Sequence, residues 1–249
     1  MYAPRRTVIS LDSQSKQPAK PEELATGEIE LIGGLPNASN YTLLARVVGT
    51  SEPVHVVYKP ILGESPLWDF PYATLALREV AAFELSDRAG FGFVPCTVIR
   101  SGPLGVGSVQ VFIEHDPSVT SFTLEEERAA DLRRVALFDL VVNNADRKGG
   151  HVLRDDQGAI WAVDHGVCFH PRYKLRTVLW SWVEAPFEQE ERAILERVCS
   201  DLKGEYSEAL RRYLSPQEIS AMVERVENLL ERGTFPAPGP GRHYPWPPV

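Results

Sequence analysis

Two aspartates flank a short predicted hairpin and could act on one substrate. Asp146 lies in the polar segment 143–151, which reads NNADRKGGH, and Asp164 opens an Asp-His-Gly sequence. The apolar runs 152–154 and 160–163 between them are joined by Asp-Asp-Gln-Gly, which predicts a hairpin. Because a hairpin brings its ends together, both carboxylates could face one reaction volume. Phosphoryl transfer needs such a pair, one acid to orient the attacking hydroxyl and one to hold a metal against nucleotide phosphates.

Each aspartate alone also fits an ordinary structural role, because the first could lie in a solvated turn and the second could end a strand. Two upstream residues favour chemistry. Lys59 follows the apolar strand 54–58, and Glu79 lies twenty positions later on a predicted helix. A strand-borne lysine paired with a helix-borne glutamate is a way to hold a cation on nucleotide phosphates. The ordered set Lys59, Glu79, Asp146 and Asp164 therefore predicts a nucleotide phosphotransfer site.

The elements that would position these residues indicate an α+β fold. Short β-rich runs, one helical segment at 73–87 and then a series of helices follow one another along the chain. The predicted strands are 28–32, 41–48, 54–58, 96–99 and 108–113, and the later helices are 124–142, 188–202, 205–214 and 216–231. Ser215, with Glu218 three residues later, is typical of a helix N-cap. This order predicts two lobes with a cleft between them.

The predicted organisation has four parts. Residues 1–26 are a mobile N-terminal lead-in, 27–114 a β-rich N-terminal lobe with one helix, 115–233 a mainly helical C-terminal lobe, and 234–249 a proline-rich tail. Six prolines in the tail exclude a continuing helix and favour an extended arm. Its Tyr244 and Trp246 could pack against the body or meet a protein partner.

Composition excludes several other classes of protein. The chain has 249 residues, with 26 Lys and Arg against 34 Asp and Glu, so its formal net charge is −8. A general nucleic-acid binder would show a basic excess instead. Three widely spaced cysteines fit neither a disulfide framework nor a zinc knuckle. The apolar run 135–142 is broken by Asp139 and is too short to cross a membrane. We therefore expect a cytoplasmic protein with no transmembrane segment.

The segments 144–147 (NADR) and 164–166 (DHG) resemble those of the phosphatidylinositol 3-/4-kinase-like atypical kinases, in particular their actinobacterial kinase-like branch, and more distantly the HipA-type kinases. The resemblance implies a two-lobed protein-kinase-like fold that uses ATP with Mg²⁺ or Mn²⁺. Lys59 would contact phosphate, Glu79 would pair with it, Asp146 would be the catalytic-loop base and Asp164 the metal ligand. The implied activity is transfer of the γ-phosphoryl group to a hydroxyl of a small-molecule, inositol-like or protein acceptor.

The same resemblance assigns the rest of a nucleotide site. The loop 33–40, which lacks the usual glycine fingerprint, would grip phosphates through Ser39 and Asn40. Residues Phe112, Ile113 and Glu114 would cross between the lobes and bind adenine through their backbone. On its residues alone, the loop could equally be an ordinary polar hairpin turn.

His151 departs from the family pattern, which places a metal-binding asparagine five residues after the catalytic aspartate. An imidazole suits Mn²⁺ better than the harder Mg²⁺. The alternative is a histidine that hydrogen-bonds the loop without touching metal. In that case catalysis could be weak, and the protein could be a pseudokinase that acts as a nucleotide-binding regulatory module.

Three cations follow at the position of an activation segment: Arg172, Lys174 and Arg176. They could hold an anionic acceptor, or they could form a solvated charge run. Two enzyme classes fit less well. A metal-dependent hydrolase would have ligand-type residues here but no typical ligand spacing, and the GxSxG sequence of serine hydrolases does not occur.

Overall fold

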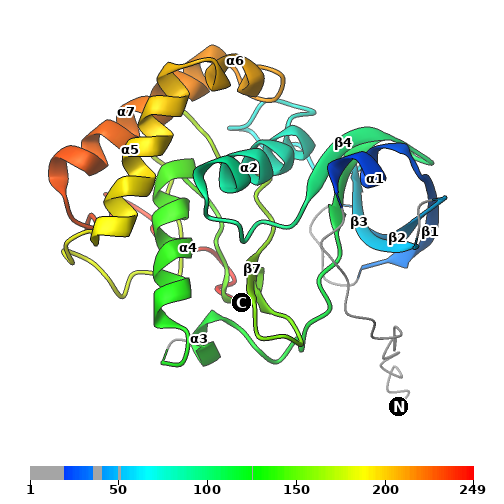
Figure 1. Ribbon diagram of the computed structural model, residues 1–249, viewed down its shortest axis with the longest axis horizontal. Helices are drawn as coiled ribbons and strands as arrows, with labels where there is room; N and C mark the ends of the chain where they lie inside the picture. The colour runs from blue at the N-terminus through cyan, green and yellow to red at the C-terminus, as the bar shows by residue number, and fades with distance from the viewer. Residues whose placement is uncertain (1–19, 36–40, 50–51, 125) are drawn as a thin grey trace.

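The computed structural model describes residues 20–249 except 36–40, 50–51 and 125. A five-stranded antiparallel sheet occupies one side of the molecule, and helices α4 to α7 occupy the other (Figure 1). The strand order is β1-β2-β3-β5-β4, with a separate two-stranded ribbon formed by β6 and β7. The fold is therefore α+β with a β-rich and a helical lobe, and the two-lobed α+β arrangement predicted from the sequence is confirmed.

All seven predicted strands occur, and six of them have shifted ends whereas β6 has the predicted bounds. The strands are β1 (Glu28–Gly34), β2 (Leu43–Val48), β3 (Val54–Pro60), β4 (Thr97–Gly102), β5 (Gly105–Val111), β6 (Val152–Arg154) and β7 (Ile160–Ala162). The α-helices are α1 (Pro21–Thr26), α2 (Leu75–Ala89), α3 (Ser121–Leu124), α4 (Ala129–Val142), α5 (Gln189–Lys203), α6 (Tyr206–Leu210) and α7 (Pro216–Arg232). Single 3₁₀ turns lie at Ile61–Gly63 and Gly149–His151. The predicted N-cap of α7 is confirmed, because the Ser215 side chain accepts a hydrogen bond from the Glu218 N–H.

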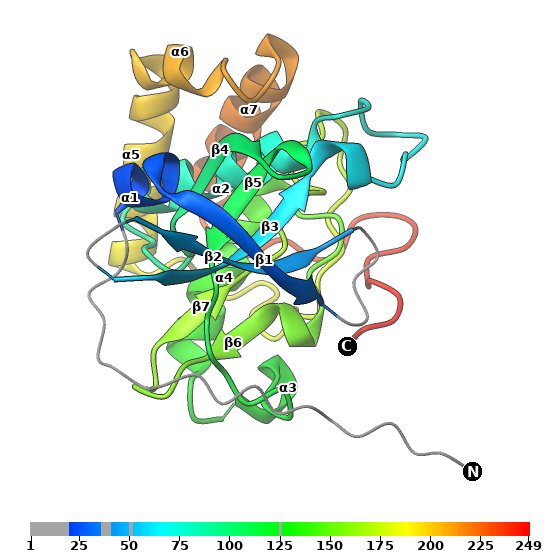
Figure 2. The same cartoon turned by 90° about the vertical axis from the view of Figure 1, so that its right-hand side faces the viewer.

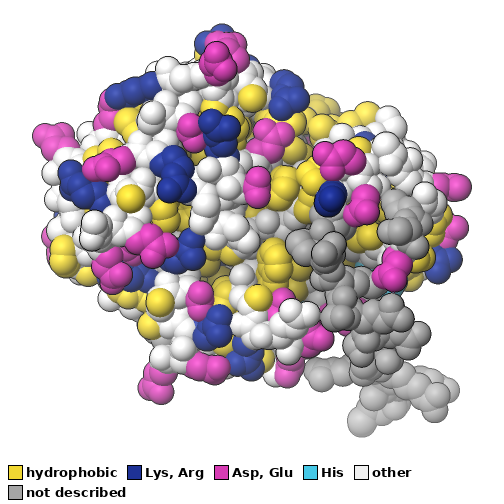
Figure 3. Space-filling model, in the orientation of Figure 1, with side chains coloured by type: hydrophobic (Ala, Val, Ile, Leu, Met, Phe, Trp, Pro, Cys, Tyr) yellow, Lys and Arg dark blue, Asp and Glu magenta, His cyan; other side chains and the backbone are white. Residues whose placement is uncertain are grey.

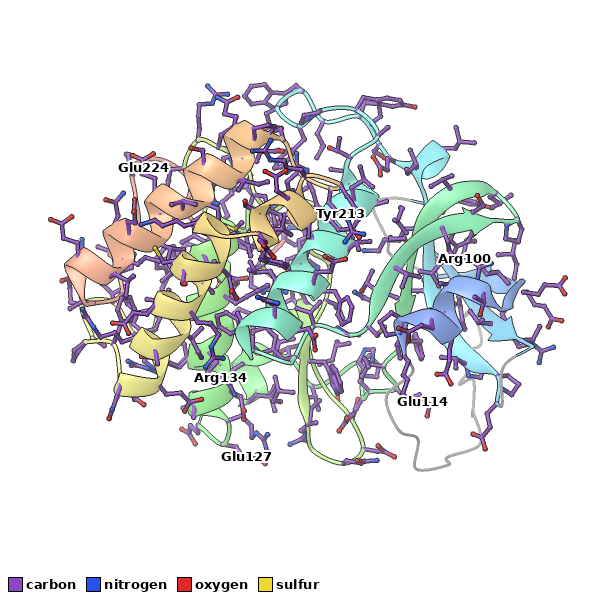
Figure 4. All side chains as sticks on the ribbon, turned by 45° about the horizontal axis from the view of Figure 1, so that its top comes forward. Arg100, Glu114, Glu127, Arg134, Tyr213 and Glu224 are labelled. Carbon is purple, nitrogen blue, oxygen red and sulfur yellow. The ribbon has the colours of Figure 1, made fainter. Side chains whose placement is uncertain are left out.

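The predicted mobile lead-in was placed too far along the chain, at 1–26, because residues 21–26 form helix α1. Its Leu24 is fully buried against the sheet, together with side chains such as Val56 and Tyr58. Arg100 on β4 donates to the carbonyls of Leu24 and Gly27, at 2.7 Å each, and Figure 4 shows Arg100 beside this helix. One apolar side chain in a polar segment gives little periodicity, which is why the sequence does not indicate this helix.

Helix α2 connects the two lobes. Its Ala81, Ala82 and Leu85 belong to the large core of the helical lobe. At its first turn, Arg78 donates to Glu218 on α7, and both side chains are buried. Nearer its C-terminal end, Glu84 accepts from Tyr213, which Figure 4 shows against this helix. The helix that carries Glu79 is therefore fixed to the helical lobe.

The proline-rich tail, residues 234–249, has neither helix nor strand, and it contacts the body through the buried side chain of Phe235 and through its backbone. The carbonyl of His243 accepts from the Thr177 N–H at 3.1 Å, and the carbonyl of Pro248 accepts from the Gly149 N–H at 2.8 Å. Tyr244 and Trp246 nevertheless keep their side chains exposed. The predicted protein partner of the tail stays a prediction.

Charged side chains of both signs intermingle over the face of the molecule seen in Figure 3. Within the described residues, no helix is both long enough and apolar enough to cross a bilayer.

Candidate functional site

Lys59 lies between two carboxylates that come from distant parts of the chain. It stands near the end of β3, and its Nζ donates to Glu79 on α2 and, at 2.9 Å, to Asp164 Oδ1. Burial alone would lower the pKa of Lys59, but the charges of Asp164 and Glu79 outweigh it and raise that pKa above its usual value. The ammonium group is therefore charged at neutral pH and faces two anions.

Glu79 also holds the segment that follows Asp164. Its side chain is almost fully buried, and its Oε2 accepts from the His165 N–H at 2.9 Å. A buried carboxylate is stable only when it is paired and hydrogen-bonded, and this one meets both conditions. One glutamate thus fixes the sheet lysine and the start of the 164–167 segment relative to each other.

Asp164 adopts the left-handed backbone region, with φ of 62°. This conformation costs a non-glycine residue free energy, and such backbone strain is common at functional sites. The positive charge of Lys59 is the main cause that holds the pKa of Asp164 well below its usual range, although burial opposes it. The carboxylate is therefore an anion at every ordinary pH, as a metal ligand must be.

The loop that carries Asp146 is held from below by a buried ion pair. Asp139 on α4 accepts from the guanidinium of Arg147 at 3.0–3.1 Å, and neither side chain is exposed. Arg147 also donates to the Val163 carbonyl at 2.8 Å and contacts His165 Nε2 at 2.6 Å. The residue after Asp146 is thereby tied to the segment that leaves the β6–β7 ribbon after β7. The expectation that this hairpin brings its two ends together is confirmed.

The carboxylate of Asp146 is more exposed than this buried ion pair. Asn144 Oδ1 accepts from the Asp146 N–H at 3.0 Å, and Lys148 Nζ lies 3.1 Å from Asp146 Oδ2. Burial is the largest cause that raises the pKa of Asp146, with Asp164 adding to it and Lys148 opposing it. A raised pKa makes a carboxylate a better proton acceptor, which suits a general base.

These four side chains line one pocket. It encloses about 490 Å³ of empty space, part of it open to solvent. Its lining consists of Tyr41, Lys59, Pro60, Glu64, Leu75, Ala76, Glu79, Asp146, Asp164, Gly166 and Val167. The set Lys59, Glu79, Asp146 and Asp164, assembled from the sequence, thus converges in space from a strand, a helix and two loops.

Other predicted nucleotide-binding residues do not line this pocket. Ser39 and Asn40 lie outside the described residues. Phe112, Ile113 and Glu114 follow β5 as an extended crossing segment, but they are absent from the pocket lining. The Phe112 N–H already donates to the His55 carbonyl, at 2.9 Å. The Ile113 carbonyl is also paired, because it lies 2.8 Å from His115 Nδ1. The adenine-binding role of these three residues stays a prediction.

His151 lies beside Asp164. Its Nε2 is 3.4 Å from Asp164 Oδ2, and its Nδ1 accepts from the Lys148 N–H at 3.4 Å. Burial is the main cause that lowers the pKa of His151 to about 4, so the ring is neutral at pH 7. A neutral ring that accepts at Nδ1 carries its proton on Nε2, which then points at Asp164. This geometry favours the role of a hydrogen-bonding histidine over that of a metal ligand.

The donors fit a cation that is shared with phosphates. No group of three or more His, Cys, Asp or Glu side chains suited to a metal occurs among the described residues. Asp164, with His151 beside it, nevertheless offers the one or two protein ligands that Mg²⁺ typically takes when substrate phosphates supply the rest.

The three predicted acceptor-binding cations have different surroundings. Lys174 is paired, because its Nζ donates to Asp69 at 2.6 Å and lies 5.2 Å from the centre of the Trp68 ring, and its acceptor-binding role stays a prediction. Its charge is neutralised there and fixes the β3–α2 connection. Arg172 is exposed. Arg176 contacts both sides of Asp146 through its backbone, because its N–H donates to the Asn144 carbonyl and its carbonyl accepts from the Arg147 N–H.

Sequence reasoning missed two residues of the site, Lys148 and Asp139. Lys148 is the second residue after Asp146 and makes an ion pair with it. Asp139 was visible only as the charge that interrupts the apolar run 135–142. A charge in an apolar helix face is the signal that could have found it, since such a charge has to be paired.

Comparisons with known proteins place the chain in a family. No family model matches it. It is 38% identical over 259 residues to Protein Rv2133c of Mycobacterium tuberculosis, and the match covers 90% of this chain and 93% of that protein. The chain belongs to the family of Protein Rv2133c.

This Rv2133c-family chain is also similar to two plant proteins named as phosphatidylinositol 4-kinases. It is 30% identical over 192 residues to phosphatidylinositol 4-kinase gamma 4 of Oryza sativa, which covers 65% of the chain. The corresponding protein of Arabidopsis thaliana is 32% identical over 206 residues, covering 64% of the chain. The chain spans 33% and 35% of these two longer proteins. It is therefore kinase-like at a coarse level.

Among solved structures, the Rv2133c-family chain superposes on the Helicobacter pylori proinflammatory kinase CtkA with a TM-score of 0.48 and 12% sequence identity. The superposition covers 85% of this chain and 94% of that one.

Proposed function

We propose that the chain is an ATP-dependent phosphotransferase that moves the γ-phosphoryl group to a hydroxyl. The observation that carries the proposal is the convergence of Lys59, Glu79, Asp146 and Asp164 in one pocket. A charged lysine, a strongly acidic carboxylate and a second carboxylate with a raised pKa have three different tasks in phosphoryl transfer. The likeness to plant kinases supports the same class of reaction.

The proposed reaction uses the side chains as follows. Lys59, oriented by Glu79, binds phosphate oxygens of the nucleotide and neutralises their charge. Asp146 accepts the proton of the acceptor hydroxyl as its oxygen attacks the γ-phosphorus. The bond from the γ-phosphorus to the bridging oxygen breaks, and ADP leaves with that electron pair. Lys148, 3.1 Å from Asp146, offers a second positive charge to the phosphoryl group in transit.

The cofactors of this proposal are ATP and Mg²⁺ or Mn²⁺. Asp164 would hold the metal, His151 would orient Asp164, and the metal would supply neutralisation of phosphate charge. Ile113 and Glu114 would bind adenine through their backbone, and Ser39 and Asn40 would bind phosphate. The acceptor would be a small-molecule, inositol-like or protein hydroxyl.

The test is incubation with γ-labelled ATP and either Mg²⁺ or Mn²⁺. Label released to water, transferred to the chain or transferred to a panel of polyols would be measured together for the wild type, Asp146→Asn and Asp156→Asn. Asp156 is an exposed aspartate in the turn of the β6–β7 ribbon and serves as the matched control. We expect turnover in the wild type and the control only. Equal turnover in all three would overturn the assignment of Asp146.

A second candidate is a pseudokinase that binds nucleotide and regulates a partner. The observation that favours it is His151, whose proton points at Asp164 where the family pattern has an asparagine. Both candidates predict that ATP with metal raises the melting temperature and that Lys59→Ala reduces the gain. Stabilisation without any loss of γ-phosphate would identify the pseudokinase, whereas absent stabilisation would contradict both.

A further inference from the structure

The chain that joins β3 to α2 carries a glutamate into the pocket. Glu64 comes five residues after Lys59, directly after the 3₁₀ turn Ile61–Gly63, and it lines the same pocket as Lys59 and Glu79. Figure 2 shows this connection in cyan, projecting from the body beyond the end of β3. The proposed reaction gives Glu64 no task. Its place in the pocket therefore points to a supporting role.

Glu64 accepts hydrogen bonds from the first turn of α2. Its Oε1 accepts from the Ala76 N–H at 2.8 Å, and its Oε2 accepts from the Leu75 N–H at 3.3 Å. Thr74, at the N-cap position, makes no side-chain cap of its own, and its hydroxyl donates to the Pro71 carbonyl at 2.8 Å. The first N–H groups of a helix have no partner within it, and a carboxylate suits the positive end of the helix dipole. Glu64 therefore supplies the missing cap from a distant position in the chain.

The turn that precedes Glu64 is itself held against the start of β2. The Gly63 carbonyl accepts from the Tyr41 N–H at 3.2 Å, and a Cβ atom at Gly63 would stand 2.5 Å from the Tyr41 Cβ. Only glycine allows this close approach. Tyr41 stands two residues before β2 and also lines the pocket. Residues 61–64 therefore join three elements: the end of β3, the start of β2 and the first turn of α2.

Lys59 and Glu79 meet where the sheet faces α2, and Glu64 joins the same two elements. Lys59 belongs to the sheet, whereas Glu79 lies on a helix that is fixed to the helical lobe through its buried Arg78. The pair therefore depends on where the first turn of α2 lies relative to the end of β3. Hydrogen bonds from N–H groups to a carboxylate are stronger than those between neutral groups. The two bonds to Glu64 thus hold this relative position before a nucleotide binds.

We propose that Glu64 is a positioning residue, which holds the first turn of α2 against the end of β3 and so sets Glu79 on Lys59 for nucleotide binding. This inference rests on the proposed phosphotransferase function and adds Glu64 to the residues that prepare its nucleotide site. Glu64 acts through Glu79 and not on the nucleotide itself. Its removal should therefore weaken nucleotide binding only as far as the Lys59–Glu79 pair contributes to that binding.

The experiment is a double-mutant cycle on the full chain, with binding of a non-hydrolysable ATP analogue and Mg²⁺ measured by calorimetry. We expect Glu64→Ala to raise the dissociation constant about fivefold to tenfold, as for the loss of one net hydrogen bond, and Glu79→Ala to raise it further. The double variant should bind no more weakly than Glu79→Ala, because the first residue acts through the second. Lys59→Ala provides a second cycle, which breaks the same pair from its other side.

The direction of the change separates positioning from a direct electrostatic effect. Removal of a negative charge from the pocket would by itself strengthen binding of an anionic nucleotide, whereas loss of positioning weakens it. Glu64→Gln removes the charge but keeps one oxygen acceptor for the first turn of α2. It should therefore recover part of the affinity that Glu64→Ala loses.

Glu23→Ala is the matched control. Glu23 also binds a backbone N–H at the start of a helix, since its Oε2 accepts from the Lys20 N–H at 3.0 Å beside α1, but it does not line the pocket. This variant should leave analogue binding unchanged. Unchanged or tighter binding by Glu64→Ala, or losses that add independently in both cycles, would overturn the inference. Absence of analogue binding in the wild type would overturn the proposed function itself, so the two failures are distinguishable.

Discussion

The two sides of the site are held by different kinds of contact. On the phosphate side, Lys59, Glu79 and Asp164 are joined by side-chain ion pairs that cross from the sheet to the helical lobe. On the acceptor side, the loop around Asp146 is framed by backbone hydrogen bonds to the 176–178 segment and to Pro248 in the proline-rich tail. Side-chain charges can be recognised in a sequence, whereas backbone pairing between distant segments leaves no mark in it. The phosphate side can therefore be predicted from the sequence, whereas the acceptor side cannot.

The two sides also differ in what fixes them to the rest of the molecule. Helix α2 contributes Ala81, Ala82 and Leu85 to the large core of the helical lobe, and it places Glu79 against Lys59. A helix with that much buried surface does not swing without losing several kcal/mol of burial. The phosphate side is thus assembled in the absence of nucleotide. The acceptor side depends instead on a segment without helix or strand.

The largest expected effect separates the two sides directly. Asp146→Asn removes the proton acceptor, so kcat should fall by about 10³-fold, within the range of general-base contributions. The nucleotide dissociation constant should stay close to that of the wild type, because Asp146 acts on the acceptor hydroxyl. Asp164→Asn should instead weaken binding of the metal–nucleotide complex as well. Turnover and analogue binding, measured on both variants, check this division; identical behaviour of the two would contradict it.

The next effect concerns the support beneath Asp146. Asp139→Asn leaves the buried Arg147 guanidinium without its anion, which should cost about 3 kcal/mol in the free energy of unfolding. Denaturant unfolding of the full chain gives this value. Asp131→Asn on the same helix is the control, because its pair with Arg128 is partly exposed and should contribute less than about 1 kcal/mol. Similar losses in both variants would show that the buried pair does not hold the loop.

Particular residues show how far the sequence reaches. Lys59, Glu79, Asp146 and Asp164 could be assembled because each follows a recognisable element at a spacing that phosphoryl transfer requires. The seven strands could be predicted from runs of β-forming residues bounded by turn residues, because these local features mark a strand before its pairing partner is known. Their ends shifted by up to three residues, because pairing with a neighbour sets the end of a strand. For example, β5 extends from Gly105, which pairs with β4, to Val111, which pairs with β3.

Other residues could not be placed from the sequence, for physical reasons. From the sequence, Lys174 has no evident partner, because Asp69, with which it pairs in the structure, is 105 positions away in the chain. Helix α1 exists because Leu24 finds a place on the sheet, which its own polar segment does not indicate. The proline-rich tail contacts the loop around Asp146 through the carbonyl of Pro248, a group that every residue possesses. In each case a contact distant in the chain decides the role of the residue.

A smaller effect is expected from the pair that anchors α2. Burial would raise the pKa of Glu218, but Arg78 and the hydrogen bonds from Ser215 outweigh it and lower that pKa below its usual value. The pair therefore stabilises the fold fully above the pKa of an unfolded glutamate, about 4.3, and the stabilisation is lost as pH falls through the lower folded pKa. Glu218→Gln should cost about 2 kcal/mol at pH 7.

Urea unfolding at several pH values tests this, with Glu184→Gln as the control for an exposed glutamate that also pairs with an arginine. The difference between the wild type and Glu218→Gln should shrink below pH 4.3 or thereabouts, since the wild-type carboxylate then becomes protonated. Because α2 carries Glu79, the variant should also weaken nucleotide binding. A pH-independent difference would show that the carboxylate charge contributes nothing.

The smallest effect is expected at His151, where the phosphate and acceptor sides meet. His151 Nδ1 accepts from the Lys148 N–H, so the ring proton lies on Nε2 and points at Asp164 Oδ2, 3.4 Å away. A ring in this state orients Asp164 and does not coordinate metal. His151→Asn should therefore lower turnover with Mg²⁺ and with Mn²⁺ by the same factor of about two to five, as expected for one modest hydrogen bond. If the imidazole were a ligand, the variant would instead shift preference toward Mg²⁺, because an amide oxygen replaces a nitrogen that favours Mn²⁺. Parallel assays with the two metals decide between these outcomes. A changed ratio of the two rates would show that His151 binds the metal instead of orienting Asp164.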